Sequence, residues 1–420
     1  MKVAGVLKTS LPVLVLAAFG ASAQAQTPLS LWYHGAGNPV EREVLIGLID
    51  DFNGSQGDWV IELAEFPQES YNESVVAAAL AGNLPDIVDV DGPVMPNWAW
   101  AGYLRPLELP EGTIDGFLPG TIGEWNGELY TVGLWDAAVA VLARQSVLDE
   151  YGIRIPTLDD PWDREELDAA LTTLQASGDF EYPFDVGMAW TGEWYPYAFG
   201  PFLQSFGGDI FDASIPTAEG VLNGDEGIDF GEWWQSLFDR ELVPGVSQDA
   251  ADRETGFVDG RYAMQWNGNW AVLSALETYG DDLLILPAPD FGNGPTIGAA
   301  SWQFGVSSTS EHPDGANEFI AFLLQDEYQA AFSNALGLVP ATADAAAISE
   351  YYSEGGPLEV FYGLSEQQAR LRVVSPGYLV AALEFEKAMT DIASGADVAD
   401  ALDAAADAIN DDLERNNGYQ

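Results

Sequence analysis

The chain has 420 residues, and its 67 aspartates and glutamates against 14 lysines and arginines give a formal net charge of −53. This balance excludes a nucleic-acid-binding protein, because neutralising phosphates takes clustered lysine and arginine, and it argues against docking on anionic lipid, which needs a basic surface. Hydrophobic residues make up 47% of the chain and cysteine is absent, so we expect a folded protein without disulfides, thiolate metal sites or a cysteine nucleophile.

The first residues have the pattern of an export signal. Lys2 and Lys8 supply the positive region, residues 11–19 form a short apolar run, and Ala23–Ala25 has the small-x-small pattern of a cleavage site. The apolar run is too short to span a bilayer. We therefore predict a signal peptide over residues 1–25, cleaved after Ala25, and a soluble exported protein.

The first third of the mature chain alternates strand and helix patterns. Strands are predicted at Leu29–His34, Trp59–Phe66 and Ile87–Val90. A helix begins at Asn38, since an asparagine cap is followed by proline and, three residues after the cap, by glutamate. A second helix covers Ser70–Ala81. This order predicts a largely parallel sheet covered by helices.

A second α/β region begins with a strand around Val139–Leu142. A further strand at Leu283–Leu286 precedes a Pro-Ala-Pro segment, where the chain is expected to cross between two lobes. Helices are predicted, in chain order, at Trp162–Ala176, near Tyr197–Phe206, at Phe230–Leu237, and around residues 380–392 and 402–413. No internal repeat or low-complexity linker is present, so the two lobes should be joined by several close crossovers.

Four groups of short motifs carry a resemblance to a known family. They are Leu84–Val88 with Gly102–Leu107; Asn126–Tyr130 leading through Asp136 to Tyr151–Ile153; Gly256–Met264 with Asn267–Trp270; and His312–Ile320 ending at Gly337–Pro340. Their order and spacing extend over nearly the whole mature chain. With them the chain resembles the extracellular (periplasmic) solute-binding proteins of carbohydrate ABC transporters, the maltose-binding-protein-like family.

The resemblance implies an α/β, two-lobed periplasmic-binding-protein fold with three interlobe crossovers and a ligand cleft between the lobes. Lobe I would comprise residues 26–137 plus 285–340, and lobe II residues 138–284 plus 341–420. It also implies that a monomer in the periplasm binds a sugar by hinge closure and delivers it to the permease subunits of an ABC importer. The abundance of aromatic residues favours a di- or oligosaccharide, for example an α-glucoside, with no cofactor or metal.

A sugar offers an apolar C–H face and a rim of hydroxyl groups, so its site needs flat aromatic rings and polar partners. Trp270 is the leading candidate, because it matches a family motif whose tryptophan stacks on the sugar. The other candidates are Trp302 after the second crossover, Trp194 and Tyr197 in an aromatic loop, Tyr378 at a helix start, Asp91 beyond the third strand, Asp136 at the first crossover and His34 at the end of the first strand. The alternatives are core packing for the aromatics, a solvated loop for the acids and a structural role for the histidine.

Two other functions stay open on the sequence. Aromatic and acidic side chains also form cages for quaternary ammonium or other cationic ligands. A glycoside hydrolase needs a pair of carboxylates, and 67 acids always contain some pair. No metalloprotease, phosphate-loop or dinucleotide motif is present, and we expect no enzyme. The excess of acids is interpreted as a solvated surface suited to a salty medium; calcium sites are the alternative, but no stretch has EF-hand spacing.

Overall fold

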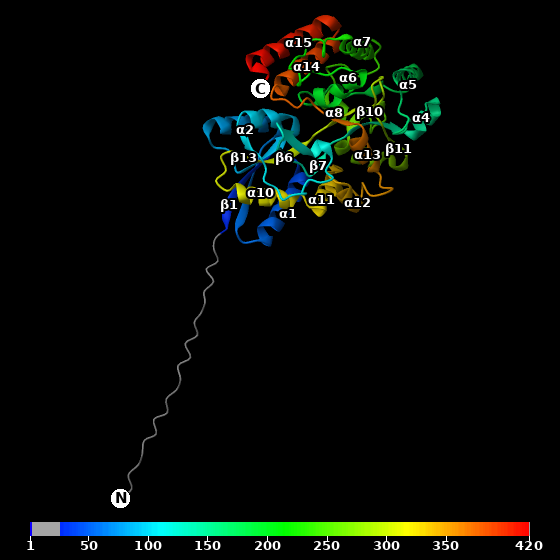
Figure 1. Cartoon of the computed structure of the whole chain (residues 1–420). Coiled ribbons are helices and arrows are strands. Elements are labelled where there is room, and N and C mark those ends of the chain that lie inside the picture. Colours follow the sequence, from blue (N-terminus) through cyan, green and yellow to red (C-terminus); the bar gives the residue numbers. More distant parts are fainter. Residues whose placement is uncertain (2–25, 420) are drawn as a thin grey trace.

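The computed structural model describes residues 26–419 and, before them, only Met1, so the predicted signal peptide and its cleavage site lie outside the described residues. Two sheets organise this part of the chain into two lobes (Figure 1). The lower lobe in the view is blue, cyan and yellow, and the upper lobe is mostly green, orange and red. Within the described residues, no helix combines the length and the apolar character that crossing a bilayer requires.

Lobe I is built on a mixed sheet with the strand order β2-β1-β3-β13-β6-β5, and β4 pairs with β13 at one end. Its strands are β1 (Thr27–Tyr33), β2 (Trp59–Glu65), β3 (Ile87–Asp91), β4 (Leu104–Arg105), β5 (Ile122–Trp125), β6 (Glu128–Val132) and β13 (Trp302–Ser307). Strand β1 is parallel to both β2 and β3, as predicted, whereas β13 runs antiparallel to β3.

The helices of lobe I cover both faces of this sheet. They are α1 (Pro39–Ser55), α2 (Gln68–Ala81), α3 (Met95–Trp100), α10 (Pro313–Leu323) and α11 (Asp326–Leu336). One apolar cluster lies between the sheet and α1 and α10, and a second lies between the sheet and α2 and α3. The sheet is therefore covered by apolar packing on both faces.

Helix α1 begins where the sequence predicts. The Asn38 side-chain oxygen accepts a hydrogen bond from the Glu41 backbone N–H at 3.2 Å, and the Asn38 amide donates to the Glu41 carboxylate at 3.0 Å. Pro39 occupies the first helical position, where no backbone N–H is needed. This cap fixes the loop between β1 and α1, which carries His34 at the carboxyl end of the sheet.

Lobe II is built on a four-stranded sheet with the order β11-β8-β10-β9. Its strands are β8 (Val139–Arg144), β9 (Tyr182–Asp185), β10 (Tyr262–Gly268) and β11 (Leu283–Leu286). Its helices are α4 (Gln145–Tyr151), α5 (Arg164–Ser177), α6 (Gly200–Phe206), α7 (Asp225–Asp239), α8 (Ala250–Thr255), α9 (Val272–Tyr279), α13 (Glu359–Gln367), α14 (Tyr378–Ala393) and α15 (Val398–Arg415). The predicted helix near Tyr197–Phe206 is only partly α-helical, since Tyr195–Phe199 forms a wider π-helical turn before α6.

Two short strand pairs lie where the chain passes between the sheets. Strand β7 (Trp135–Asp136) pairs with β14 (Val339–Pro340), and β12 (Ile297–Ala299) pairs with β15 (Ala369–Leu371). The helix α12 (Ala343–Ile348) follows β14 and packs on α11. The chain thus goes from the first sheet to the second after β6 and returns before β13.

The packing of residues 285–299 suggests where the second crossing between the lobes lies. Strand β11 pairs with β8 as far as Leu286, and Ala288 and Ile297 belong to the apolar core of lobe II. Residues 285–299 therefore pack with lobe II, although the sequence-derived division assigns them to lobe I. We propose that the second crossing lies at Ala300, whose backbone has a φ of +78°.

Candidate functional site

Three side chains meet at the carboxyl edge of the lobe I sheet. Strands β1 and β3 are parallel, so the residues at their ends, His34 and Asp91, lie at the same edge. Strand β13 runs the other way, and its first residue, Trp302, pairs with Asp91. The Trp302 indole stacks on the His34 imidazole with ring centroids 3.7 Å apart and an interplanar angle of 5°.

Buried acids surround the His34 ring. Its Nδ1 is hydrogen-bonded to the fully buried Asp89, and its Nε2 lies 3.6 Å from Glu41. The Tyr33 hydroxyl donates to the same Glu41 carboxylate at 2.5 Å. Burial by itself lowers the pKa of His34, but the hydrogen bond and charge of Asp89, with the charges of Glu41 and Asp91, outweigh it and raise this pKa above 6.5. An open hollow of about 410 Å³ adjoins His34, lined by the β1–α1 loop and the start of α2.

Asp136 lies at the first crossing and is completely buried. Its Oδ1 accepts the Ala137 backbone N–H at 2.8 Å, whereas its Oδ2 has no hydrogen-bond partner among residues 26–419. Burial raises the pKa of Asp136 to about 7, and burial likewise raises the pKa of Asp91 to about 7 against the opposing charge of Arg372. Both carboxyl groups therefore sit close to the point of ionisation at neutral pH, and Oδ2 of Asp136 has hydrogen-bonding capacity to spare.

Lobe II contributes an aromatic cluster around Trp270. The ring centroids of Trp190 and Trp194 lie 6.4 Å from that of Trp270, and the ring of Tyr197 lies 6.0 Å away. Trp194 and Tyr197 are buried, with exposed fractions of 6% and 7%, whereas Trp270 and Trp190 keep part of their surface exposed. Trp270 packs against the apolar cores of both lobes, so it lies at the interlobe boundary.

Glycine makes this ring packing possible. A Cβ atom at Gly268 would lie 2.1 Å from the Trp270 ring, and one at Gly187 would lie 2.8 Å from Nε1 of Trp194. Gly187 also has a φ of +91°, a conformation that side chains with a Cβ rarely adopt. The motif that identifies Trp270 in the sequence therefore contains the glycine on which its indole rests.

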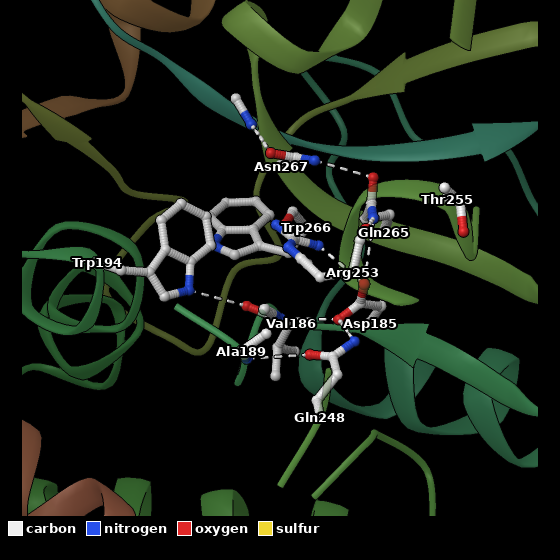
Figure 2. A network of polar contacts seen from close by, with 12 residues as sticks. Asp185, Val186, Ala189, Trp194, Gln248, Arg253, Thr255, Gln265, Trp266 and Asn267 are labelled. Atoms are coloured by element: carbon white, nitrogen blue, oxygen red, sulfur yellow. Dashed lines mark hydrogen bonds and ion pairs between the residues drawn. The ribbon is translucent and has the colours of Figure 1, made fainter. Parts of the chain in front are cut away.

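A buried polar network supports the aromatic cluster from the lobe II side (Figure 2). The Arg253 guanidinium donates to Asp185 at 3.0 Å and to the Trp266 carbonyl at 2.6 Å, and both charged side chains are completely buried. Gln265 donates to the same carboxylate at 3.1 Å. The guanidinium carbon lies 4.6 Å from the ring centroid of Trp190, at cation–π distance.

Arg372 connects the remaining groups. Its guanidinium donates to Glu193 at 2.6 Å and to the Ala300 carbonyl at 2.7 Å, and lies 5.0 Å from the Tyr197 ring. The Tyr378 hydroxyl donates to Glu193 at 2.6 Å. A cavity of about 290 Å³ opens beside Arg372, and its lining includes Gly92 and Met95 of lobe I, Ala300 at the second crossing, and residues 371–374.

The family model described as bacterial extracellular solute-binding protein matches residues 47–356, which is most of the chain. The chain belongs to the bacterial extracellular solute-binding protein family. This places it in a family of exported binding proteins and not of enzymes.

Solved structures show the same fold. The cyclic α-maltosyl-1,6-maltose binding protein of Arthrobacter globiformis has a TM-score of 0.77 at 22% identity, covering 93% of this chain and 100% of its own. The sugar-binding protein of Xanthomonas citri has a TM-score of 0.77 at 18% identity, covering 93% and 98%. The maltose/maltodextrin-binding domain of Bdellovibrio bacteriovorus, bound to maltotriose, has a TM-score of 0.72 at 18% identity, covering 92% and 100%. The α/β two-lobed architecture is therefore confirmed.

In this solute-binding protein the predicted site residues fall into two groups. His34, Asp91 and Trp302 lie together on lobe I. The second group lies at the crossings and on lobe II, and consists of Asp136, Trp194, Tyr197, Trp270 and Tyr378. Tyr378 and His34 are buried, at 0% and 5% exposure, so their predicted contact with ligand would require the surroundings to move.

Sequence reasoning missed the charged partners of these rings. Glu193, Arg253 and Arg372 were not among the candidates, yet each contacts predicted site residues. A usable signal did exist: the chain has only 14 lysines and arginines, so an arginine that lies close to a family motif is unusual. Arg253 precedes the Gly256–Met264 motif, and Arg372 precedes Tyr378.

Proposed function

We propose that this solute-binding protein binds a carbohydrate, specifically a di- or oligosaccharide, between its two lobes and delivers it to the permease of an ABC importer. The observation that carries the proposal is a pair of partly exposed tryptophans, Trp302 on lobe I and Trp270 at the boundary with lobe II, next to carboxyl groups with unused hydrogen-bonding capacity. Aromatic faces suit the C–H faces of sugar rings, and carboxyl groups suit their hydroxyls.

The printed ligands of structural neighbours agree with this ligand class. They include a cyclic maltosyl-maltose, maltotriose and acarbose. Ligands of this length need several aromatic contacts, and four of the 14 tryptophans of the chain lie at or around the proposed site, at positions 190, 194, 270 and 302. Carbohydrate binding by hinge closure follows the behaviour expected of two lobes joined by short crossings.

The arrangement disfavours the cationic-ligand alternative. Two of the aromatic groups already face a cation of the protein, since Trp190 faces Arg253 and Tyr197 faces Arg372. One face of a third ring, Trp302, is already covered by His34. A second cation at the same rings would be repelled and would find their negative faces partly used. We therefore expect choline-type compounds not to compete with sugars.

A thermal-shift screen tests the proposal. Maltose, maltotriose and a cyclic maltodextrin should each be added to the mature protein, with choline as the comparison ligand. A sugar at about 100 times its dissociation constant raises the free energy of unfolding by about 2.7 kcal/mol, which such a screen detects. Stabilisation by choline and by no sugar would contradict the proposal.

Replacing Trp270 locates the site. Trp270→Ala should lose most of the sugar-induced shift, because the partly exposed indole at the lobe boundary is removed. Trp59→Ala is the matched control, since Trp59 is also half-buried but packs on Gly315 and donates to Glu318, within lobe I. The control should keep the full shift, and an unchanged shift in Trp270→Ala would remove this residue from the site.

A further inference from the structure

At the carboxyl edge of the lobe I sheet, Asp89 is hydrogen-bonded to His34, and His34 is stacked on Trp302. Asp89 is 0% exposed and is hydrogen-bonded through Oδ2 to Nδ1 of His34. The imidazole lies parallel to the Trp302 indole, with ring centroids 3.7 Å apart. Asp89, His34 and Trp302 come from β3, the end of β1 and β13, so the stack exists only because these strands are neighbours.

The charge environment favours an imidazolium. The groups that face His34 are Asp89 and Asp91 from β3, Glu41 from α1, Tyr33 from β1, Trp302 from β13 and, behind Asp89, Tyr71 from α2. Asp89 Oδ1 has no hydrogen-bond partner in the described part of the chain. Burial raises the pKa of Asp89, and the charge and hydrogen bond of His34 oppose this rise, so the ionised carboxylate and the imidazolium in direct contact with it stabilise each other.

The parallel contact between the two rings lets a positive charge on His34 attract the Trp302 indole. An imidazolium stacked on an indole face is attracted by the ring quadrupole, and the attraction is larger when both groups are removed from water. His34 is 5% exposed, while Trp302 keeps part of its surface exposed. The stack therefore restrains the orientation of a ring that is still accessible to a ligand.

We propose that His34 is a positioning residue for Trp302, so that its protonation, maintained by Asp89, fixes the indole as a platform for the sugar and couples sugar affinity to pH. The sugar part of this inference rests on the proposed function. Because protonated His34 holds the Trp302 indole in place for the sugar, affinity should be highest at low pH. It should fall by about fivefold as pH rises past the point where His34 loses its proton.

A proton NMR titration tests the charge directly and needs no ligand. The chain has two histidines, His34 and His312, so the variant His312→Gln leaves the Hε1 resonance of a single imidazole. This resonance should titrate above the ordinary value of 6.5, and Asp89→Asn should move its midpoint down. A midpoint at or below 6.5 in the otherwise unchanged protein would overturn the inference.

Fluorescence tests the stack. The difference between the intact protein and Trp302→Phe isolates the emission of one indole, and a stacked imidazolium quenches such emission. The difference signal should rise with pH at the same midpoint as the NMR titration and should lose this step in His34→Gln. A pH-independent difference signal would show that His34 does not hold the ring.

Isothermal titration with maltotriose between about pH 5 and pH 9 tests the coupling. The intact protein should lose affinity with rising pH, and His34→Gln should bind weakly and lose less affinity over the same range, because only the site carboxyl groups Asp91 and Asp136 still titrate there. Equal profiles in both proteins would overturn the coupling. Absence of maltotriose binding at every pH, with the NMR and fluorescence steps present, would count against the proposed ligand and leave the His34–Trp302 positioning supported.

Discussion

Trp270 depends on a single glycine for its position. A Cβ atom added at Gly268 would lie 2.1 Å from the nearest atom of the Trp270 indole. The backbone φ of Gly268, −94°, is one that any residue adopts. The requirement is therefore for space and not for an unusual backbone conformation. Substitution at this glycine should act on the ring and leave the chain path of β10 intact.

We predict that Gly268→Ala displaces Trp270, weakens sugar binding at least tenfold and lowers the free energy of unfolding by about 1–3 kcal/mol, the usual effect of overpacking. Titration calorimetry and urea denaturation measure the two effects. Gly47→Ala is the control, because its Cβ in α1 meets nothing within 4 Å. It should keep full affinity and gain up to about 1 kcal/mol of stability.

The ion pair beneath the aromatic cluster gives a second prediction at this scale. Arg253 and Asp185 are both at 0% side-chain exposure, so neither charge has water as an alternative partner (Figure 2). Removing one charge by Arg253→Met should lower the free energy of unfolding by about 3–5 kcal/mol, because the other stays buried and uncompensated. The double variant with Asp185→Leu should recover part of this loss in urea denaturation, whereas additive losses would contradict the explanation.

Among the elements, α1 shows how local sequence prepares the site. Its asparagine cap and proline hold the end of β1 in a fixed loop, and Glu41 in the first turn lies beside His34 and Tyr33. The helix thus brings a carboxylate to the site as part of its own N-terminal structure. A carboxylate in the first turn also interacts favourably with the helix dipole.

We predict that Asn38→Ala lowers the free energy of unfolding by about 1 kcal/mol, because two hydrogen bonds at the helix start are lost. Asn38→Ser keeps an acceptor at the cap and should lose only a fraction of this amount. Urea denaturation of the three proteins checks the order. Equal stability of the alanine and asparagine proteins would show that the cap contributes nothing.

In the whole molecule, two carboxyl groups lie where the lobes meet, the fully buried Asp136 and the partly buried Asp91. Asp91 and Asp136 have pKa values raised from 3.8 to about 7, chiefly by burial. Between pH 4 and pH 7 the folded protein keeps protons on these two carboxyl groups that the unfolded chain has already released. The free energy of unfolding therefore falls as pH rises from about 4 to about 7 and then levels off. The net charge of −53 adds to the same trend, since ionisation increases self-repulsion.

We predict that Asp136→Asn loses less stability than the intact protein between about pH 4 and pH 7, because one of the ionising groups is gone. Calorimetric melting at a series of pH values, at constant high salt to screen surface charges, measures the difference. The exposed Asp159→Asn is the control and should follow the intact protein. Parallel curves for all three proteins would show that Asp136 does not ionise in this range.

Local patterns in the sequence were sufficient for many elements. The cap at Asn38, the three parallel strands of lobe I and the amphipathic helices near the end of the chain all follow from residues that are close in sequence. The order of the family motifs also predicted the two-lobed fold correctly, because each motif is a local signal and the spacing of the motifs along the chain is shared with the family.

The partners of the site residues were decided by tertiary structure alone. Arg253 meets Asp185 across 68 positions, and Arg372 meets Glu193 across 179 positions. No periodicity connects such residues, because the sheet order and the chain crossings determine which strand ends become neighbours. For the same reason the sequence by itself determined the family and the two-lobed fold and predicted aromatic and acidic candidates for the site, while only the tertiary structure decided that His34 stacks on Trp302 and that Tyr378 donates to Glu193.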